Sequence, residues 1–108
     1  MNKTDLFSDN LQEIARICKV LSHPARLAII KYLSDCKTCI SGDISDHLPL
    51  SRSTVSQHLS ELKEIGLILG TIDGLKINYC LDNERLKYYK GLLENFLSKV
   101  SDNQFKCN

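Results

Sequence analysis

Apolar residues recur at alternating intervals of three and four at both ends of the chain. This spacing predicts one helix that begins after about Ser8 and another that runs from about Glu84 to Val100. The apolar members of the first are Leu11, Ile14, Cys18 and Leu21. Those of the second are Leu86, Tyr89, Leu93, Phe96 and Val100. A stripe of this kind is typical of a helix that packs against a partner helix.

The core of one small chain can hardly bury both stripes. A chain of 108 residues forms only a modest core, and burial of both stripes across a twofold axis is the economical arrangement. We therefore predict a homodimer. Its expected interface residues are Leu11, Ile14, Leu21, Leu86, Tyr89, Leu93 and Phe96. The alternative is that both stripes pack within one chain.

The segment from Gly42 to Gly66 has the pattern of two helices joined by a short turn. A short helix ends before Pro49, and Ser51 supplies a hydroxyl that can cap the next helix. One face of this second helix is apolar and carries Val55, Leu59, Leu62 and Ile65. The opposite face carries Ser53, Ser56, Gln57, Ser60 and Glu64. This pattern predicts a helix-turn-helix, although a polar face alone is equally typical of an ordinary solvated helix.

Two β-rich runs, 67–72 and 75–81, follow the helix-turn-helix and flank the dipeptide Asp73-Gly74. Asp-Gly between such runs is a strong signal for a two-residue hairpin. In the second run apolar and polar residues alternate, which predicts one buried and one exposed face. A hairpin directly after a helix-turn-helix is the wing of a winged helix, and this conjunction favours DNA binding. The predicted fold is thus mainly α with a small β-hairpin, one domain over residues 1–108 with flexible ends at 1–8 and 101–108.

Composition and charge narrow the function only modestly. The chain is 43% hydrophobic and 25% charged, as in soluble globular proteins. It has no apolar run of membrane-spanning length and no apolar core of a signal peptide near its start, so we expect a cytoplasmic protein. The net charge is +1, and residues 51–79 carry equal numbers of basic and acidic residues. A DNA binder of this kind would draw phosphate affinity from helix N-termini and scattered cations.

Five cysteines are many for such a chain. Their odd number and a reducing compartment argue against a disulfide framework, and favour free thiols, a metal or metalloid site, or a redox switch. Cys36 and Cys39 are spaced so that their sulfurs can share a soft ion or close into a disulfide. Cys18 lies on an apolar stripe and Cys80 on a strand, so we expect both to be small packing residues.

The order of predicted elements and three stretches of sequence resemble the ArsR/SmtB family of bacterial winged-helix repressors. The stretches are KVLSHPARL at 19–27, SRSTVSQHL at 51–59 and LKEIGLI at 62–68. The resemblance spans about residues 11–100. It implies a transcriptional repressor, not an enzyme, that sits as a homodimer on palindromic operator DNA and leaves when an inducer binds.

The resemblance also implies which residues contact DNA. On the recognition helix they are Arg52, Ser53, Thr54, Ser56, Gln57 and His58, and on the wing they are Asp73, Gly74 and Lys76. Helical geometry agrees for Ser53, Ser56 and Gln57, which face away from the apolar stripe. His58 lies closer to that stripe, so it is either a phosphate contact or a packing residue.

The family's usual inducer sites do not carry over. The paired cysteines of arsenic sensors align with Ile40 and Gly42, the last helix lacks the histidines of zinc sensors, and Lys31 takes the place of a persulfide-sensing cysteine. The remaining candidates are Cys36 and Cys39, with a thiophilic metal or metalloid ion or an oxidant as the inducer.

Two rival functions stay open at this point. One is a winged helix that serves only dimerisation or protein contact, since fold alone does not fix function. The other is a dithiol redox protein centred on Cys36 and Cys39. Such centres lie between a strand and a helix, and no strand is predicted before Asp35.

Overall fold

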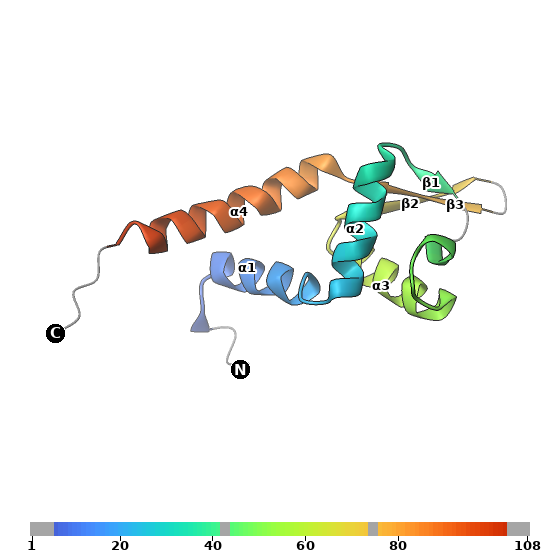
Figure 1. The fold of residues 1–108 in the computed structure, drawn as a ribbon. Helices are drawn as coiled ribbons and strands as arrows, with labels where there is room; N and C mark the ends of the chain where they lie inside the picture. The colour runs from blue at the N-terminus through green and yellow to red at the C-terminus, as the bar shows by residue number, and fades with distance from the viewer. Residues whose placement is uncertain (1–5, 42–43, 74–75, 104–108) are drawn as a thin grey trace.

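The computed structural model describes residues 6–41, 44–73 and 76–103. The elements in chain order are α1 (Asp9–Val20), α2 (Pro24–Cys36), β1 (Ile40–Ser41), the short 3-10 helix η2 (Ile44–His47), α3 (Arg52–Glu64), β2 (Ile68–Asp73), β3 (Lys76–Leu81) and α4 (Asn83–Ser101). In Figure 1 the sheet, α2 and α3 gather at one end of the molecule, and the C-terminal half of α4 extends away from them. This is the predicted winged helix-turn-helix.

Side-chain caps fix where α1, α3 and α4 begin. The Oγ of Ser51 accepts a hydrogen bond from the N–H of Thr54 at 3.3 Å, and the Oγ of Ser8 does the same for Leu11 at 3.2 Å. The carboxylate of Asp82 caps α4. Each cap satisfies backbone donors that a first helical turn leaves unpaired. Beyond the end of α3, Gly66 has a φ of 82°, the left-handed conformation that glycine adopts without strain.

The core forms where α3 packs against α2, α1 and the sheet. The four apolar residues predicted for the inner face of α3 are all buried, and Leu62 is completely inaccessible. The inner face of α1 is made by Ile14, Ile17 and Val20. Leu11 is instead exposed, and so is Cys18, which means that the prediction of Cys18 as a packing residue was wrong. Two overlapping apolar stripes run along α1, and the core takes the one that contains Ile17.

The sheet has three antiparallel strands in the order β1-β3-β2. The sequence did not predict β1, because a strand of two residues leaves no readable pattern. β2 and β3 pair in a register that joins Asp73 to Lys76, so the hairpin turns one residue later than predicted. Gly74 lies outside the described residues. The predicted alternation along β3 is only partly kept, since Ile77 is exposed while Tyr79 and Leu81 pack on the core.

Helix α4 is anchored to the rest of the chain through neighbouring tyrosines. The Tyr89 hydroxyl donates a hydrogen bond to the carbonyl of Ile65 at 2.8 Å, and the Tyr88 hydroxyl donates one to the Glu13 carboxylate. Tyr89 and Ile14 are both buried within the chain. Within one chain, these two residues therefore pack on its own core, and their predicted place in a dimer interface stays a prediction. Beyond this anchor, Leu97 and Val100 of α4 are exposed.

Candidate nucleic-acid interface

The outer face of α3 has the polar surface that the sequence predicted. Ser53, Ser56 and Gln57 are all exposed, on the side of the helix opposite to the buried Val55 and Leu59. The inner stripe fixes the rotation of the helix about its axis, so the outer face is presented in one orientation. Short side chains with both donors and acceptors suit hydrogen bonding to base edges in a major groove.

The first turn of α3 combines an exposed cation with a helix N-terminus. Arg52 is the first residue of the helix and is exposed. Thr54 is half-buried, and its Oγ1 accepts a hydrogen bond from the Ser51 hydroxyl at 2.8 Å. Helix N-termini attract phosphate through their unpaired N–H groups and dipole. Arg52 lies at this N-terminus, where a DNA phosphate would be attracted. The Thr54 hydroxyl takes part in the helix cap.

His58 faces inward and joins α3 to α2. Its Nδ1 accepts a hydrogen bond from Nε of Arg26 at 3.0 Å, and its ring lies 5.7 Å from that of His23. An imidazole nitrogen that accepts from a guanidinium must be unprotonated. Burial, and then the charges of Arg26 and His23, lower the pKa of His58. Of the two predicted roles, this geometry supports packing.

The helix-turn-helix is tied to α2 at a second point. The ring of Tyr32 stacks on that of His47 in η2 with 5.2 Å between centroids, and Ile44 of η2 is buried. The wing is less completely described. Asp73 and Lys76 end β2 and begin β3, but their side chains, like Gly74, lie outside the described residues. Their predicted DNA contacts stay predictions.

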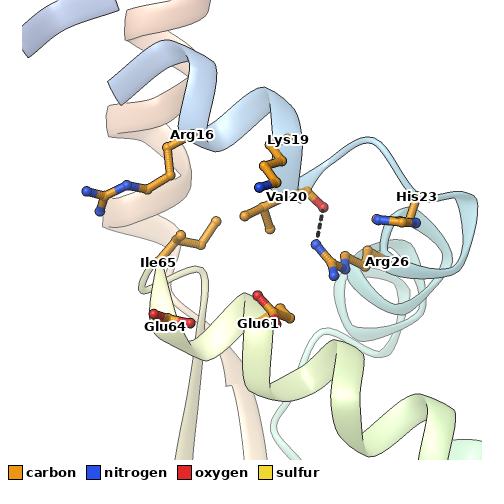
Figure 2. A pocket seen from close by; sticks show the side chains of 8 residues that line it. All are labelled: Arg16, Lys19, Val20, His23, Arg26, Glu61, Glu64 and Ile65. Carbon is orange, nitrogen blue, oxygen red and sulfur yellow. Dashed lines mark hydrogen bonds between the residues drawn. The ribbon is translucent and has the colours of Figure 1, made fainter. Parts of the chain in front are cut away.

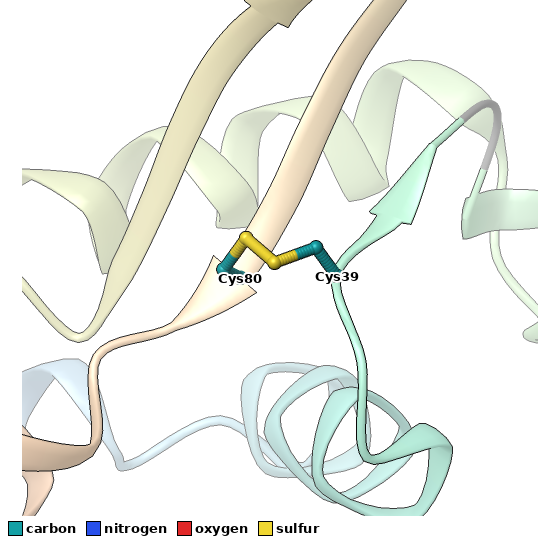
Figure 3. The surroundings of a disulfide bond; sticks show 2 residues. All are labelled: Cys39 and Cys80. Carbon is teal, nitrogen blue, oxygen red and sulfur yellow. A yellow bond between two sulfur atoms is a disulfide. The ribbon is translucent and has the colours of Figure 1, made fainter.

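The cysteines pair in a way that the sequence did not reveal. Cys39 forms a disulfide with Cys80, and their Cα atoms are 4.4 Å apart (Figure 3). The sequence suggested Cys36 and Cys39 as a pair, but Cys39 bonds to Cys80 instead. The reason is Lys37, which ends α2 in the left-handed conformation with a φ of 57° and turns the chain so that Cys39 leaves the helix that holds Cys36. The prediction of Cys80 as a packing residue was also wrong.

Strand register explains the observed pair. Ile40 pairs with Tyr79 and Ser41 with Asn78, so the same antiparallel register places Cys39 opposite Cys80. Directly opposed residues that are not hydrogen-bonded to each other have Cα atoms about 4.5 Å apart. The one available signal was the alternation in β3, which sets Cys80 on the face opposite to Tyr79 and Leu81. It did not identify the partner strand.

Known proteins resemble both the sequence and the fold. The profile of the bacterial regulatory protein arsR family matches residues 23–68. The transcriptional regulator CmtR of Mycobacterium tuberculosis is 35% identical over 91 residues, which cover 84% of this chain and 76% of CmtR. The chain belongs to the ArsR family. The arsenical resistance operon repressor of Staphylococcus xylosus is 33% identical, with 89% of each chain covered.

Solved structures of ArsR-like proteins share the fold. HlyU from Vibrio cholerae is 27% identical with a TM-score of 0.64, covering 84% of this chain and 99% of HlyU. The homodimeric winged helix-turn-helix domain Mb0332 of Mycobacterium bovis has a TM-score of 0.65 at 18% identity, covering 100% and 95% of the two chains. As a member of the ArsR family, this chain is a DNA-binding transcriptional regulator. The family is one of regulators rather than enzymes.

The ArsR fold of this chain leaves a cavity of about 570 Å³ behind the C-terminal half of α3 (Figure 2). Basic side chains of α1 and α2 line one side, and Glu61 and Glu64 line the other. No ion pair joins the two sides in the described part of the chain. Arg26 donates a hydrogen bond to the carbonyl of Val20 at 3.2 Å, at the end of α1. This arginine therefore fastens α1, α2 and α3 together through Val20 and His58.

The residues that the structure describes contain no cluster of three or more His, Cys, Asp or Glu side chains suited to a metal ion. Of the cysteines in that part of the chain, Cys18 and Cys36 are unpaired. Cys36 contacts Tyr32, whose pKa is raised by burial and by a hydrogen bond with Cys36. Among the described helices none has the length and apolar character needed to cross a membrane.

Proposed function

We propose that this ArsR-family protein is a cytoplasmic repressor that binds palindromic operator DNA as a homodimer and releases it when an inducer reacts with its cysteines. The observation that carries the proposal is the outer face of α3. Ser53, Ser56 and Gln57 are exposed there on a helix whose inner stripe is fully buried. Recognition helices of helix-turn-helix proteins present such residues to base edges.

A dimer would supply the second half-site contact that a palindrome requires. Its support is the apolar surface that one chain leaves uncovered on the side of α1 and α4. The exposed members are Leu6, Phe7, Leu11, Leu97 and Val100. The Cα radius of gyration is 17.0 Å, against about 13 Å for a compact domain of 100 residues. Both facts fit a chain that buries these helix faces against a second copy.

The inducer class is inferred from cysteine chemistry and from relatives. The matching regulators include an arsenical resistance repressor and a cadmium resistance regulator of staphylococci. Thiophilic ions and oxidants both act on thiolates. We therefore place the response in the cysteines of this chain rather than in its carboxylates or histidines.

Selection of bound sequences from a randomised DNA pool, followed by fluorescence anisotropy at several salt concentrations, tests the proposal. A repressor is expected to enrich a palindrome and to lose affinity steeply as salt rises, because phosphate contacts release counterions. Light scattering on the same sample should give twice the chain mass of 12.2 kDa. A monomer without sequence preference, or binding without salt dependence, would favour the protein-contact module instead.

A further inference from the structure

We propose that Cys39 and Cys80 form a reversible dithiol/disulfide site that low-molecular-weight disulfides oxidise, and that oxidation weakens operator binding. This proposal rests on the proposed repressor function, because it names the site and the reagent class of the response. It replaces the pair expected from the sequence, since Cys39 bonds to Cys80 and not to Cys36.

The position of the bond in the fold is the first argument. The two cysteines are 41 positions apart in the sequence. The segment between them contains β1, η2, α3, β2 and nearly all of β3. Every residue predicted to contact DNA thus lies inside the loop that this bond closes. Its closing point lies at the edge of the wing, where β1 joins β3 (Figure 3).

The backbone is arranged for both the reduced and the oxidised state. β1 and β3 place the two Cα atoms 4.4 Å apart, which is the spacing that opposed residues of antiparallel strands have without any crosslink. The distance also lies within the range that disulfides span. The bond can therefore form and break while the strands stay paired.

A reagent can reach the sulfurs. A cavity of about 440 Å³ lies between the end of α2 and the start of α4, and both Cys39 and Cys80 line it. Lys37 lines the same cavity. A nearby cation favours the thiolate over the thiol, and the thiolate is the reactive form. Cys39 is the more exposed of the pair, so it is the residue that attacks first.

The reaction balances with the small disulfide as oxidant. The Cys39 thiolate attacks one sulfur of the reagent, forms a mixed disulfide and expels one thiolate. The Cys80 thiolate then attacks the Cys39 sulfur, closes the protein disulfide and expels the second thiolate. The protein gives up two electrons and its two thiol protons, and the reagent becomes two thiols. An excess of small thiol reverses both steps.

Oxidation changes how freely the wing and the helix-turn-helix move against each other. Without the bond, β1 is held to β3 through two residue pairs, and the chain from β1 leads within a few residues into η2. With the bond, this edge is fixed. A winged helix must fit α3 into a groove and the wing beside it at the same time. The dithiol form can adjust the two elements separately to the DNA, whereas the crosslinked form keeps one fixed spacing between them, and the proposal is that this spacing fits the operator less well.

The test measures operator affinity of the full-length protein, fully reduced and after treatment with oxidised glutathione. Wild type should bind about 5–150-fold more weakly when oxidised, the usual range of coupling between two sites, and should recover with reductant. Cys39→Ser and Cys80→Ser should bind like reduced wild type under both conditions. Cys36→Ser and Cys18→Ser, the matched controls, should respond like wild type. Lys37→Asn, which tolerates the left-handed turn without the charge, should oxidise more slowly.

The outcomes separate the two proposals. Oxidised wild type that binds as tightly as the reduced protein, or more tightly, overturns the redox site, and so does a response that survives in Cys39→Ser. Peptide mapping of the oxidised protein gives a readout that does not need DNA, and failure to find Cys39 linked to Cys80 also overturns it. The repressor proposal would be overturned instead if reduced wild type does not bind operator DNA although the disulfide-linked Cys39–Cys80 peptide forms reversibly.

Discussion

Helix α3 and the Cys39–Cys80 edge of the sheet lie in the same small domain but are held in place by contacts of very different range along the chain. The inner and outer faces of α3 follow from residues three and four positions apart, and the structure confirms both. The disulfide joins residues 41 positions apart across a strand of two residues. The faces of a helix are determined by residues that are close together in the sequence, whereas the pairing of distant strands depends on how the whole domain packs.

The largest expected effect concerns the disulfide edge. Closing a loop of 41 residues removes conformational entropy from the unfolded chain worth about 4 kcal/mol. Urea denaturation of oxidised wild type should therefore give a free energy of unfolding higher by about that amount than in reductant. Cys80→Ser should show no difference between the two conditions, while Cys36→Ser should keep it. Equal free energies of unfolding for oxidised and reduced wild type would contradict the conclusion that the disulfide stabilises the fold.

The two faces of α3 should differ sharply when shortened to alanine. Leu62 has no accessible surface, so Leu62→Ala should lower the free energy of unfolding by about 2–5 kcal/mol. Ser56→Ala, on the exposed outer face, should change it by less than about 0.5 kcal/mol. Thermal or urea denaturation in reductant measures both. Similar losses of unfolding free energy in the two variants would contradict the assignment of Leu62 to the buried face and Ser56 to the exposed face of α3.

A smaller effect tests the contact between α3 and α2. His58→Ala removes the acceptor for Arg26 and should cost about 1 kcal/mol. The lowered pKa of His58 means that the unfolded chain takes up this proton more readily than the folded one. The stability of wild type is then complete above the unfolded pKa of about 6.5, and falls as pH drops from there through the folded pKa.

His58→Ala should lose the part of the pH dependence of folding stability that comes from His58. Denaturation curves collected in steps from neutral pH to pH 5 compare the two proteins directly. Ser56→Ala, on the exposed outer face of α3, provides the control, because it leaves the hydrogen bond between Arg26 and His58 in place and should keep the acid sensitivity of wild type. If the free energy of unfolding depends on pH in the same way for wild type and His58→Ala, His58 does not help to hold α3 against α2.

The sequence revealed those parts of the fold that neighbouring residues determine. The cap at Ser51, the left-handed Gly66 and the buried stripe of α3 are local features, and all three are present. The hydrogen bonds from Arg26 to His58 and from Tyr89 to Ile65 join residues 32 and 24 positions apart. No local pattern predicts such pairs, since they depend on how helices cross.

The same distinction explains the errors at the candidate sites. In α1, two apolar stripes overlap, and only packing decides that Ile17 is buried and Cys18 exposed. In the cysteine segment, Cys36 and Cys39 are close in sequence, but the left-handed Lys37 separates them. A short spacing between two cysteines was therefore a poor guide to which sulfurs meet.

If the outer face of α3 reads DNA bases, Gln57→Ala should change both the affinity for the operator and the preference for its bases. Affinity is measured by anisotropy for the selected operator and for single-base variants of it, in reductant. We expect Gln57→Ala to lose about 1–3 kcal/mol of binding free energy per half-site and to show a relaxed preference at one base position. Asn95→Ala, an exposed amide on α4, should bind like wild type. Unchanged affinity and base preference in Gln57→Ala would contradict the claim.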